Sequence, residues 1–179
     1  MRIIAGEHRG RRLTAPPGEG TRPTSDRVRE ALFSILGPMS GLRVLDLFAG
    51  TGALGLEALS RGAEHATFVE RDRSALAALR HNIETLRVAA DTVHVHPRDA
   101  TGFLRDAAAR GDAYDLVLLD PPYRDVDRLA PVLDAGLRPL LREGTRVVAE
   151  TDRRQPLRLG LPLGDERRYG DTLIRIHGA

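Results

Sequence analysis

From residue 42 onward, short apolar runs alternate with segments in which apolar residues recur every three or four positions. The short runs predict strands, and the longer spacing predicts amphipathic helices. Strands are expected at the run ending in Asp46 and at 66–70, 92–96, 115–119 and 145–150, with two weaker candidates, 156–160 and 171–177, as an antiparallel pair. Helices are expected from the turn after Asp46 to Gly62, over 76–86, through 103–107, and over 126–142, where Pro131 and Pro139 interrupt the pattern.

The chain before residue 42 predicts an arm and one helix. Residues 1–24 carry Arg, Gly and Pro with little periodicity, so we expect an extended or short-stranded arm without a role in the core. Apolar residues then recur at helical spacing from Val28 to Leu36, and Thr24 and Ser25 can cap this helix. The arginines beside its apolar stripe, free to face solvent or a ligand, are Arg22, Arg27 and Arg29.

Strands that alternate with helices predict a mostly parallel, doubly wound α/β sheet with helices on both faces. Ligands of such sheets bind beyond the carboxyl ends of the strands. Asp46, Glu70, Asp99 and Asp120 each stand at or just after the end of an expected strand. We therefore expect these four carboxylates to share one rim of the sheet.

A glycine-rich turn follows the first strand. Gly50, Gly52 and Gly55 form the pattern G-x-G-x-x-G between a strand and a helix, where exposed backbone N–H groups suit polar or anionic ligand groups. Glu70 ends the next strand about 20 residues further on, the place of a carboxylate that binds a ribose. The pattern predicts a nucleoside-containing cofactor, and a structural turn without a ligand is the alternative.

The fourth strand ends in Asp120-Pro121-Pro122-Tyr123. Two prolines remove two N–H donors, so the loop offers the Asp120 carboxylate and the Pro121 carbonyl as acceptors, followed by an aromatic ring. Acceptors beside a ring suit a planar group that bears an NH2, such as a nucleobase stacked on Tyr123. An ordinary proline turn is the alternative.

Length and composition narrow the class of protein. A chain of 179 residues is expected to form one domain, and the absence of cysteine excludes disulfides and thiolate nucleophiles. We see no signal-peptide core and no run long enough to span a membrane, so we expect a cytoplasmic protein. The six histidines show no compact ligand pattern, and His94 and His96 are expected on strand surface; no metal is expected.

The formal net charge is only +2, but the basic residues are unevenly distributed. All of them are arginine, which binds phosphate in a bidentate manner. Arg2, Arg9, Arg11 and Arg12 stand in the first twelve residues against Glu7 alone. We expect these four arginines to contact RNA phosphates, together with Arg22 and Arg27.

The glycine turn and the Asp-Pro-Pro-Tyr loop together resemble the S-adenosylmethionine (SAM)-dependent methyltransferases that modify exocyclic amino groups. Within that class the whole chain resembles the RsmD family, the bacterial 16S rRNA (guanine(966)-N(2))-methyltransferases. The stretches that carry the resemblance are 2–6, 9–11, 22–24, 26–33, 45–55, 57–63, 115–123 and 169–172. The arm and the segment around Arg22-Pro23-Thr24 best distinguish the RsmD family from other methyltransferases, because many methyltransferases share the core motifs.

The resemblance implies a Rossmann-like class I methyltransferase fold with a seven-stranded, mostly parallel sheet and a short N-terminal extension. Residues 1–36 would contact RNA and cover the cofactor site, and residues 37–179 would form the methyltransferase domain, all in one compact unit. The reaction would transfer a methyl group to N2 of one guanine in 16S rRNA of the small ribosomal subunit, leaving S-adenosylhomocysteine (SAH). A monomer is expected.

The resemblance also assigns roles to individual residues. Asp46, Gly50 and Gly52 would hold the methionine end of the cofactor, Glu70 its ribose hydroxyls and Asp99 its adenine amine. Ala49, Arg71 and Ala100 would stand beside them in the cofactor site. Asp120, the Pro121 carbonyl and Tyr123 would hold the target base.

Three other functions are consistent with parts of the sequence. An adenine-N6 methyltransferase acting on DNA or RNA uses the same Asp-Pro-Pro-Tyr chemistry, although the DNA enzymes usually carry a target-recognition domain for which 179 residues leave little room. A nicotinamide-dependent dehydrogenase would use the glycine turn, but no hydride-transfer residues are evident. A non-enzymatic RNA-binding module would need only the basic arm.

Overall fold

The computed structural model describes residues 1–16, 26–122 and 125–178. The strands are β1 (Arg43–Asp46), β2 (His65–Glu70), β3 (Val93–Pro97), β4 (Tyr114–Leu119), β5 (Leu141–Asp152), β6 (Leu163–Tyr169) and β7 (Thr172–Gly178). The helices are α1 (Asp26–Leu36), α2 (Ala53–Ser60), α3 (Arg73–Leu86), α4 (Ala100–Arg110) and α5 (Val126–Leu137), with short 3-10 turns η1 (Ala90–Thr92) and η3 (Arg138–Leu140).

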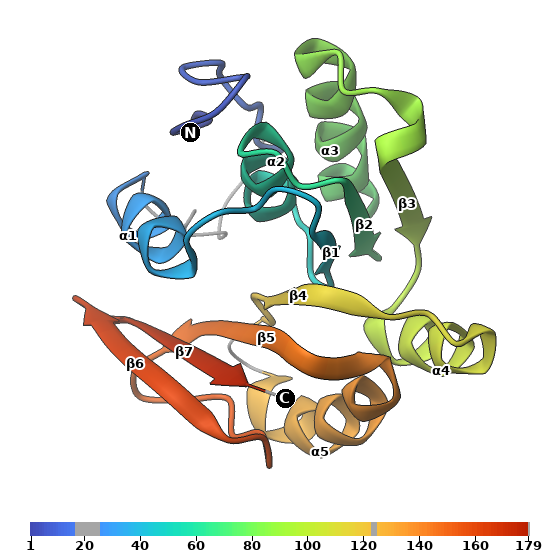
Figure 1. Cartoon of the computed structure of the whole chain (residues 1–179), viewed down its shortest axis with the longest axis vertical. Coiled ribbons are helices and arrows are strands. Elements are labelled where there is room, and N and C mark those ends of the chain that lie inside the picture. Colours follow the sequence, from blue (N-terminus) through green and yellow to red (C-terminus); the bar gives the residue numbers. More distant parts are fainter. Residues whose placement is uncertain (17–25, 123–124, 179) are drawn as a thin grey trace.

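The seven strands form one sheet in the order β3-β2-β1-β4-β5-β7-β6 (Figure 1). The pairs β3–β2, β2–β1, β1–β4 and β4–β5 are parallel, whereas β7 runs antiparallel to both β5 and β6. This arrangement confirms the predicted seven-stranded, mostly parallel sheet. The chain order reverses between β1 and β4, which places the carboxyl ends of these two strands beside the crevice where such sheets bind ligands.

The sheet has a hydrophobic core on each face, because alternate residues of a strand point to opposite sides. On β1, Val44 packs with the core beneath α1, α2 and α3, while its neighbour Leu45 packs with the core beneath α4 and α5. On β4, Leu118 and Leu119 divide in the same way. Figure 1 shows these two groups of helices on opposite faces of the sheet.

The N-terminal arm is part of the fold, contrary to our expectation that it has no role in the core. Arg2 and Arg12 form an antiparallel bridge, and Ile3 and Leu13 are buried in the core beside α2. Gly6 lies so close to the end of α2 that an added Cβ atom would stand 1.6 Å from the Ser60 carbonyl oxygen. The arm therefore packs closely against α2.

The predicted strand at 156–160 is wrong, because the strand that pairs with β7 is β6. Leu157 is fully buried, as its apolar pattern suggests. However, Gly160 bonds to side chains near α5: its N–H donates to Asp134 at 2.7 Å and its carbonyl accepts from Arg138 at 3.0 Å. Side-chain partners therefore satisfy this backbone without a strand.

The segment 126–142 also differs from the prediction. The helix α5 continues through Pro131, ends at Leu137, and is followed by η3. The strand expected at 145–150 is longer than predicted, since β5 begins at Leu141 and ends at Asp152. The cap predicted at Thr24 and Ser25 lies outside the described residues, which resume at Asp26, the first residue of α1.

Candidate functional site

The four carboxylates expected on one rim follow four strands that are neighbours in the sheet. In sheet order they are Asp99 after β3, Glu70 on β2, Asp46 on β1 and Asp120 after β4. The register places Asp46 opposite Phe68 and Leu118, so Glu70 and Asp120 each lie two residues further toward the rim. At about 3.3 Å per residue, Asp46 lies roughly 7 Å deeper than its two neighbours.

Asp46 is buried beneath the glycine turn, with 1% of its surface exposed. Its Oδ2 atom accepts a hydrogen bond from the Gly55 amide at 2.9 Å, and its Oδ1 atom is buried without a hydrogen-bond partner among the described residues. Burial, together with the charge of Glu70, raises the pKa of Asp46 to about 7, against the opposing effect of the Gly55 amide. The residue therefore shapes the turn, and its second oxygen has no donor among the described residues.

The three glycines of the turn serve different purposes. Gly52 precedes α2 with φ of 80°, and a Cβ atom there would stand 2.3 Å from Leu79 Cδ1. A Cβ atom at Gly55 would stand 2.3 Å from the Phe68 ring, so this glycine lets α2 pack closely against β2. Gly50 has φ of 53° and open space where its Cβ atom would be. The turn is therefore tightly packed on its inner side and accessible at Gly50.

Glu70 accepts hydrogen bonds from backbone amides of the glycine turn and of the residues that directly follow β2. Its Oε2 atom accepts from the Gly50 amide at 2.8 Å, and its Oε1 atom accepts from the Arg71 and Asp72 amides at 2.8 Å each. Ala49, also expected in the cofactor site, is buried and donates its amide to the Val69 carbonyl at 3.1 Å. These bonds fix the turn against the end of β2.

Two other predicted cofactor residues lie along the same rim. Asp99 caps α4, since its Oδ1 atom accepts from the Gly102 amide at 2.8 Å, and Ala100 is the buried first residue of that helix. Arg71 points across the rim to Asp125, with 3.9 Å between the charged atoms. That pair is solvent-exposed and contributes little to stability.

Asp120 and Pro121 follow β4 on the other side of β1. Asp120 is half-buried and Pro121 is buried, and the Pro122 carbonyl accepts from the Asp125 amide at 2.9 Å. Burial and the negative charges of Glu150 and Asp46 raise the pKa of Asp120 well above its ordinary value. Tyr123 lies outside the described residues.

Sequence reasoning missed Glu150, although the same rule that found the other carboxylates applies to it. Leu119 pairs with Ala149, so Asp120 and Glu150 are the next residues along two neighbouring parallel strands. Glu150 is buried with 3% of its surface exposed. Its position as a carboxylate at the end of the predicted strand 145–150 would have indicated that it belongs to this rim.

Buried charges that the sequence did not predict fasten the arm. Glu57 of α2 accepts from the Ile4 and Ala5 amides at 2.7 and 3.1 Å, and it pairs with Arg61 at 2.7 Å. Arg29, expected to face solvent or a ligand, is fully buried and bonds to the Arg2 carbonyl and, at 2.9 Å, to Asp26. The sequence does contain a sign of this arrangement, because Glu57 stands among the apolar residues of α2.

The arginines predicted to contact RNA occupy different environments. Arg2 donates to Asp26 at 3.1 Å, and Arg11 donates to the Thr85 carbonyl of α3, although both side chains are exposed. Arg9, Arg12 and Arg27 are exposed and form no ion pair with any residue that the structure describes. Arg22 lies outside the described residues.

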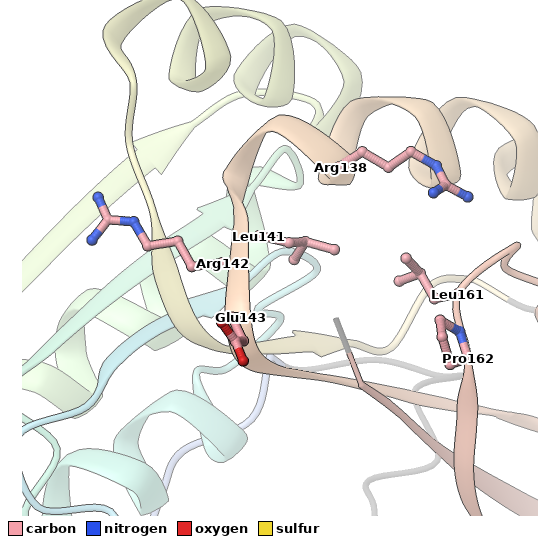
Figure 2. Close-up of a pocket in the computed structure, with 6 residues that line it drawn as sticks. All are labelled: Arg138, Leu141, Arg142, Glu143, Leu161 and Pro162. Atoms are coloured by element: carbon pink, nitrogen blue, oxygen red, sulfur yellow. The ribbon is translucent and has the colours of Figure 1, made fainter.

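A hollow elsewhere on the surface is remote from the rim (Figure 2). It is lined by Arg138, Leu141, Arg142, Glu143, Leu161 and Pro162. Leu141 is the first residue of β5, and β5 is parallel to β4, so the hollow lies at the amino ends of these strands. The hollow and Asp120 therefore lie at opposite ends of the parallel strands.

Within residues 1–16, 26–122 and 125–178, no three His, Cys, Asp or Glu residues are grouped as a metal site. No helix there is long and apolar enough to cross a membrane. The expectation that no metal takes part remains a prediction.

A family model described as conserved hypothetical protein 95 matches residues 1–178 of this chain. The chain belongs to this family, the RsmD family. It is 42% identical, over 99% of its length and 98% of the relative's, to the "Putative rRNA methyltransferase YlbH" of Bacillus subtilis. It is also 47% identical to the "Ribosomal RNA small subunit methyltransferase D" of Escherichia coli, over 69% of this chain and 61% of that protein.

Structural comparison supports the same assignment. The solved structure described as "Putative methyltransferase yhhF from Escherichia coli" is 36% identical and has a TM-score of 0.84, with 99% of this chain and 97% of that one covered. Membership of the RsmD family thus agrees with a Rossmann-like class I fold and supports methyltransferase chemistry on ribosomal RNA.

Proposed function

We propose that this RsmD-family protein is a SAM-dependent methyltransferase that modifies the exocyclic N2 of a guanine in 16S rRNA of the small ribosomal subunit. The observation that carries the proposal is the adjacency of β1 and β4: a glycine turn over a buried carboxylate stands beside Asp120-Pro121. The names of the relatives from Bacillus subtilis and Escherichia coli support ribosomal RNA as the substrate. We further propose that the protein acts in the cytoplasm as a monomer.

The residues around the glycine turn fit this cofactor. Asp46 has a buried oxygen without a partner among the described residues, which suits the ammonium of the methionine moiety, and Gly50 leaves open space for close approach. Glu70 at the end of β2 would accept from the ribose hydroxyls, and Asp99 after β3 from the adenine amine. Bound SAM supplies a methyl group that its sulfonium makes electrophilic.

The protein's contribution to the reaction is positioning. The lone pair of a guanine N2 is delocalised into the ring, which makes the nitrogen a weak nucleophile. The Asp120 carboxylate and the Pro121 carbonyl accept hydrogen bonds from its two N–H groups and orient the nitrogen toward the methyl group, while Tyr123 stacks on the base. Such orientation removes much of the entropic barrier to reaction. Asp120 is also placed to accept the proton that the nitrogen releases.

Recognition of the RNA would depend on the arm and on the shape of the target. Phosphate contacts give affinity without reading sequence, and Arg9, Arg12 and Arg27 have side chains available for them. Selectivity would come from an unstacked base that enters the site from a single-stranded region.

The proposal is tested by transfer of labelled methyl groups from SAM to small ribosomal subunits purified from a strain that lacks this gene. Nucleoside analysis of the product is expected to give N2-methylguanine. Label in N6-methyladenine would refute the guanine assignment and support an adenine-N6 methyltransferase. Absence of both SAM binding and transfer would refute methyltransferase function and favour an RNA-binding module.

A further inference from the structure

One side chain of α3 joins the N-terminal arm to the glycine turn. Asn82 is buried, with 1% of its surface exposed. Its Oδ1 atom accepts from the Thr14 amide at 2.8 Å, and its Nδ2 atom donates to the Thr14 carbonyl and to the Thr51 carbonyl, each at 3.0 Å. Both donor hydrogens and the acceptor oxygen of the amide are therefore in use.

Only a side-chain amide supplies this combination of groups at this position. An apolar residue would leave three part-buried backbone groups without these partners, and a carboxylate would face two carbonyl oxygens that need donors. The sequence gives a hint of the role, because Asn82 interrupts the apolar face formed by Leu76, Leu79, Ile83 and Leu86. A polar residue buried on such a face needs defined partners.

The Thr51 end of this linkage lies within the proposed cofactor site. Thr51 stands between Gly50 and Gly52, the residues placed at the methionine end of SAM. The turn is thus supported from two sides: Glu70 of β2 accepts from the Gly50 amide, and Asn82 of α3 donates to the Thr51 carbonyl. A change in the position of Asn82 would alter the orientation of the Thr51–Gly52 peptide.

The Thr14 end lies in the arm that carries the proposed RNA contacts. Thr14 follows Arg12 by two residues, and Arg11 bonds to the Thr85 carbonyl one turn further along α3. The backbone of the arm beside Arg11 and Arg12 is therefore held by the same helix that supports the glycine turn.

We propose that Asn82 is a positioning residue that couples cofactor binding at the glycine turn to the seating of the RNA-binding arm. The inference rests on the proposed function, since it needs both ligands. A ligand that orders one end of the linkage reduces the cost of ordering the other, so the two ligands bind cooperatively. By reciprocity, SAH tightens RNA binding by the same factor by which RNA tightens SAH binding.

The test weakens the linkage at the arm, away from the cofactor. Thr14→Pro removes the amide that donates to Asn82 but keeps the Thr14 carbonyl that accepts from Asn82, and it does not alter the Ile4 and Ala5 amides that donate to Glu57. SAH affinity is measured by calorimetry, and affinity for small ribosomal subunits lacking the modification is measured with and without saturating SAH. Thr92→Pro is the matched control, because it removes a backbone bond to Ala89 at η1, in another part of the fold.

Thr14→Pro is expected to weaken SAH binding about fivefold, the effect of one lost hydrogen bond, and to reduce the enhancement of RNA affinity by SAH. Asn82→Leu removes all three bonds and should abolish this enhancement if the variant folds. Asn82→Gln should also lose the enhancement, because the longer side chain moves the amide. Thr92→Pro should leave both quantities unchanged.

The affinity of the wild-type protein for SAH distinguishes failure of the inference about Asn82 from failure of the proposed function. If the wild-type protein binds SAH, and Thr14→Pro binds it equally well with coupling intact, Asn82 only fastens the arm and the inference is refuted while the proposed function stands. If the wild-type protein does not bind SAH, the proposed function fails and the inference fails with it.

Discussion

Glu70 accepts a hydrogen bond from the Gly50 amide at 2.8 Å, which ties the end of β2 to the glycine turn after β1. The same carboxylate accepts from the Arg71 and Asp72 amides. Three amide donors hold its two oxygens toward the crevice. A side chain predicted only as a ribose ligand thus also sets the shape of the turn.

We expect Glu70→Ala to weaken SAM binding about 30- to 100-fold, equivalent to about 2 to 3 kcal/mol, because both the ribose contact and the support of the turn are lost. Calorimetry measures the change. Glu84→Ala, which removes a carboxylate from the exposed surface of α3, is the control and should bind normally. Unchanged affinity in Glu70→Ala would remove this residue from the site.

The raised pKa of Asp120 predicts that the methyl-transfer rate depends on pH, and that Glu150 influences this dependence. The ionised carboxylate is the stronger acceptor for the base and the form that can take up its proton. Burial, with the charges of Glu150 and Asp46, raises the pKa of this group. The acidic limb of the rate profile should therefore lie above the ordinary range of a carboxyl group. Glu150→Gln removes one of those charges and should move this limb to lower pH.

The measurement is kcat against pH for both proteins under saturating SAM. Asp120→Ala, measured alongside, should lose most turnover and keep its affinity for SAM within a few-fold. A Glu150→Gln profile that coincides with that of the wild type would show that Glu150 does not influence the titrating group.

Asp46→Asn is predicted to alter the pH dependence of stability. The pKa of Asp46 is about 7 in the folded protein, so the native state binds more protons than the unfolded state from about pH 4 upward. The contribution of Asp46 to stability is consequently lost as the pH rises through this range. Asparagine keeps an oxygen for the Gly55 amide and carries no charge.

The free energy of unfolding of Asp46→Asn, relative to the wild type, should therefore increase between about pH 5 and about pH 8, by on the order of 2 to 3 kcal/mol. Urea unfolding at the two pH values measures it, with the exposed Asp91→Asn as control. A difference independent of pH would contradict the raised pKa.

Arg9 and Arg12 are expected to contact RNA phosphates, since both are exposed on the arm. Changing both to Ala should weaken RNA binding and reduce the slope of log affinity against log salt by roughly 1.5 to 2 units, with folding and SAM affinity retained. Arg105→Ala, on α4 at the opposite face of the sheet, is the matched control. Lost activity with an unchanged slope would mean that the arm acts by ordering the site.

Tyr123 follows the described part of the loop, and its role as a stacking ring is a prediction. Tyr123→Phe keeps the ring and should retain most activity, whereas Tyr123→Ala should lose much of it. Single-turnover methyl transfer compares the two. Equal losses would assign the role to the hydroxyl group.

The sequence by itself determined the alternation of strands and helices, the glycine turn and the carboxylates at the strand ends. These features depend on neighbouring residues. Val44 and Leu45 face opposite cores because a strand alternates its side chains, and Gly50 and Gly52 can adopt the positive φ angles of the turn because they lack a Cβ atom. The resemblance to the RsmD family rested on the same local motifs, and the family is confirmed.

Tertiary structure decided which of these groups are buried and what they touch. Leu157 looked like a strand residue, but its segment bonds to side chains near α5, and the polar strand β6 occupies the edge of the sheet. Arg29 was expected to face solvent or a ligand, and nothing was predicted for Asn82, yet both are buried and bond to the backbone of the arm. Local periodicity records how a segment distributes its own side chains, whereas burial and hydrogen bonding depend on which distant segment packs against it.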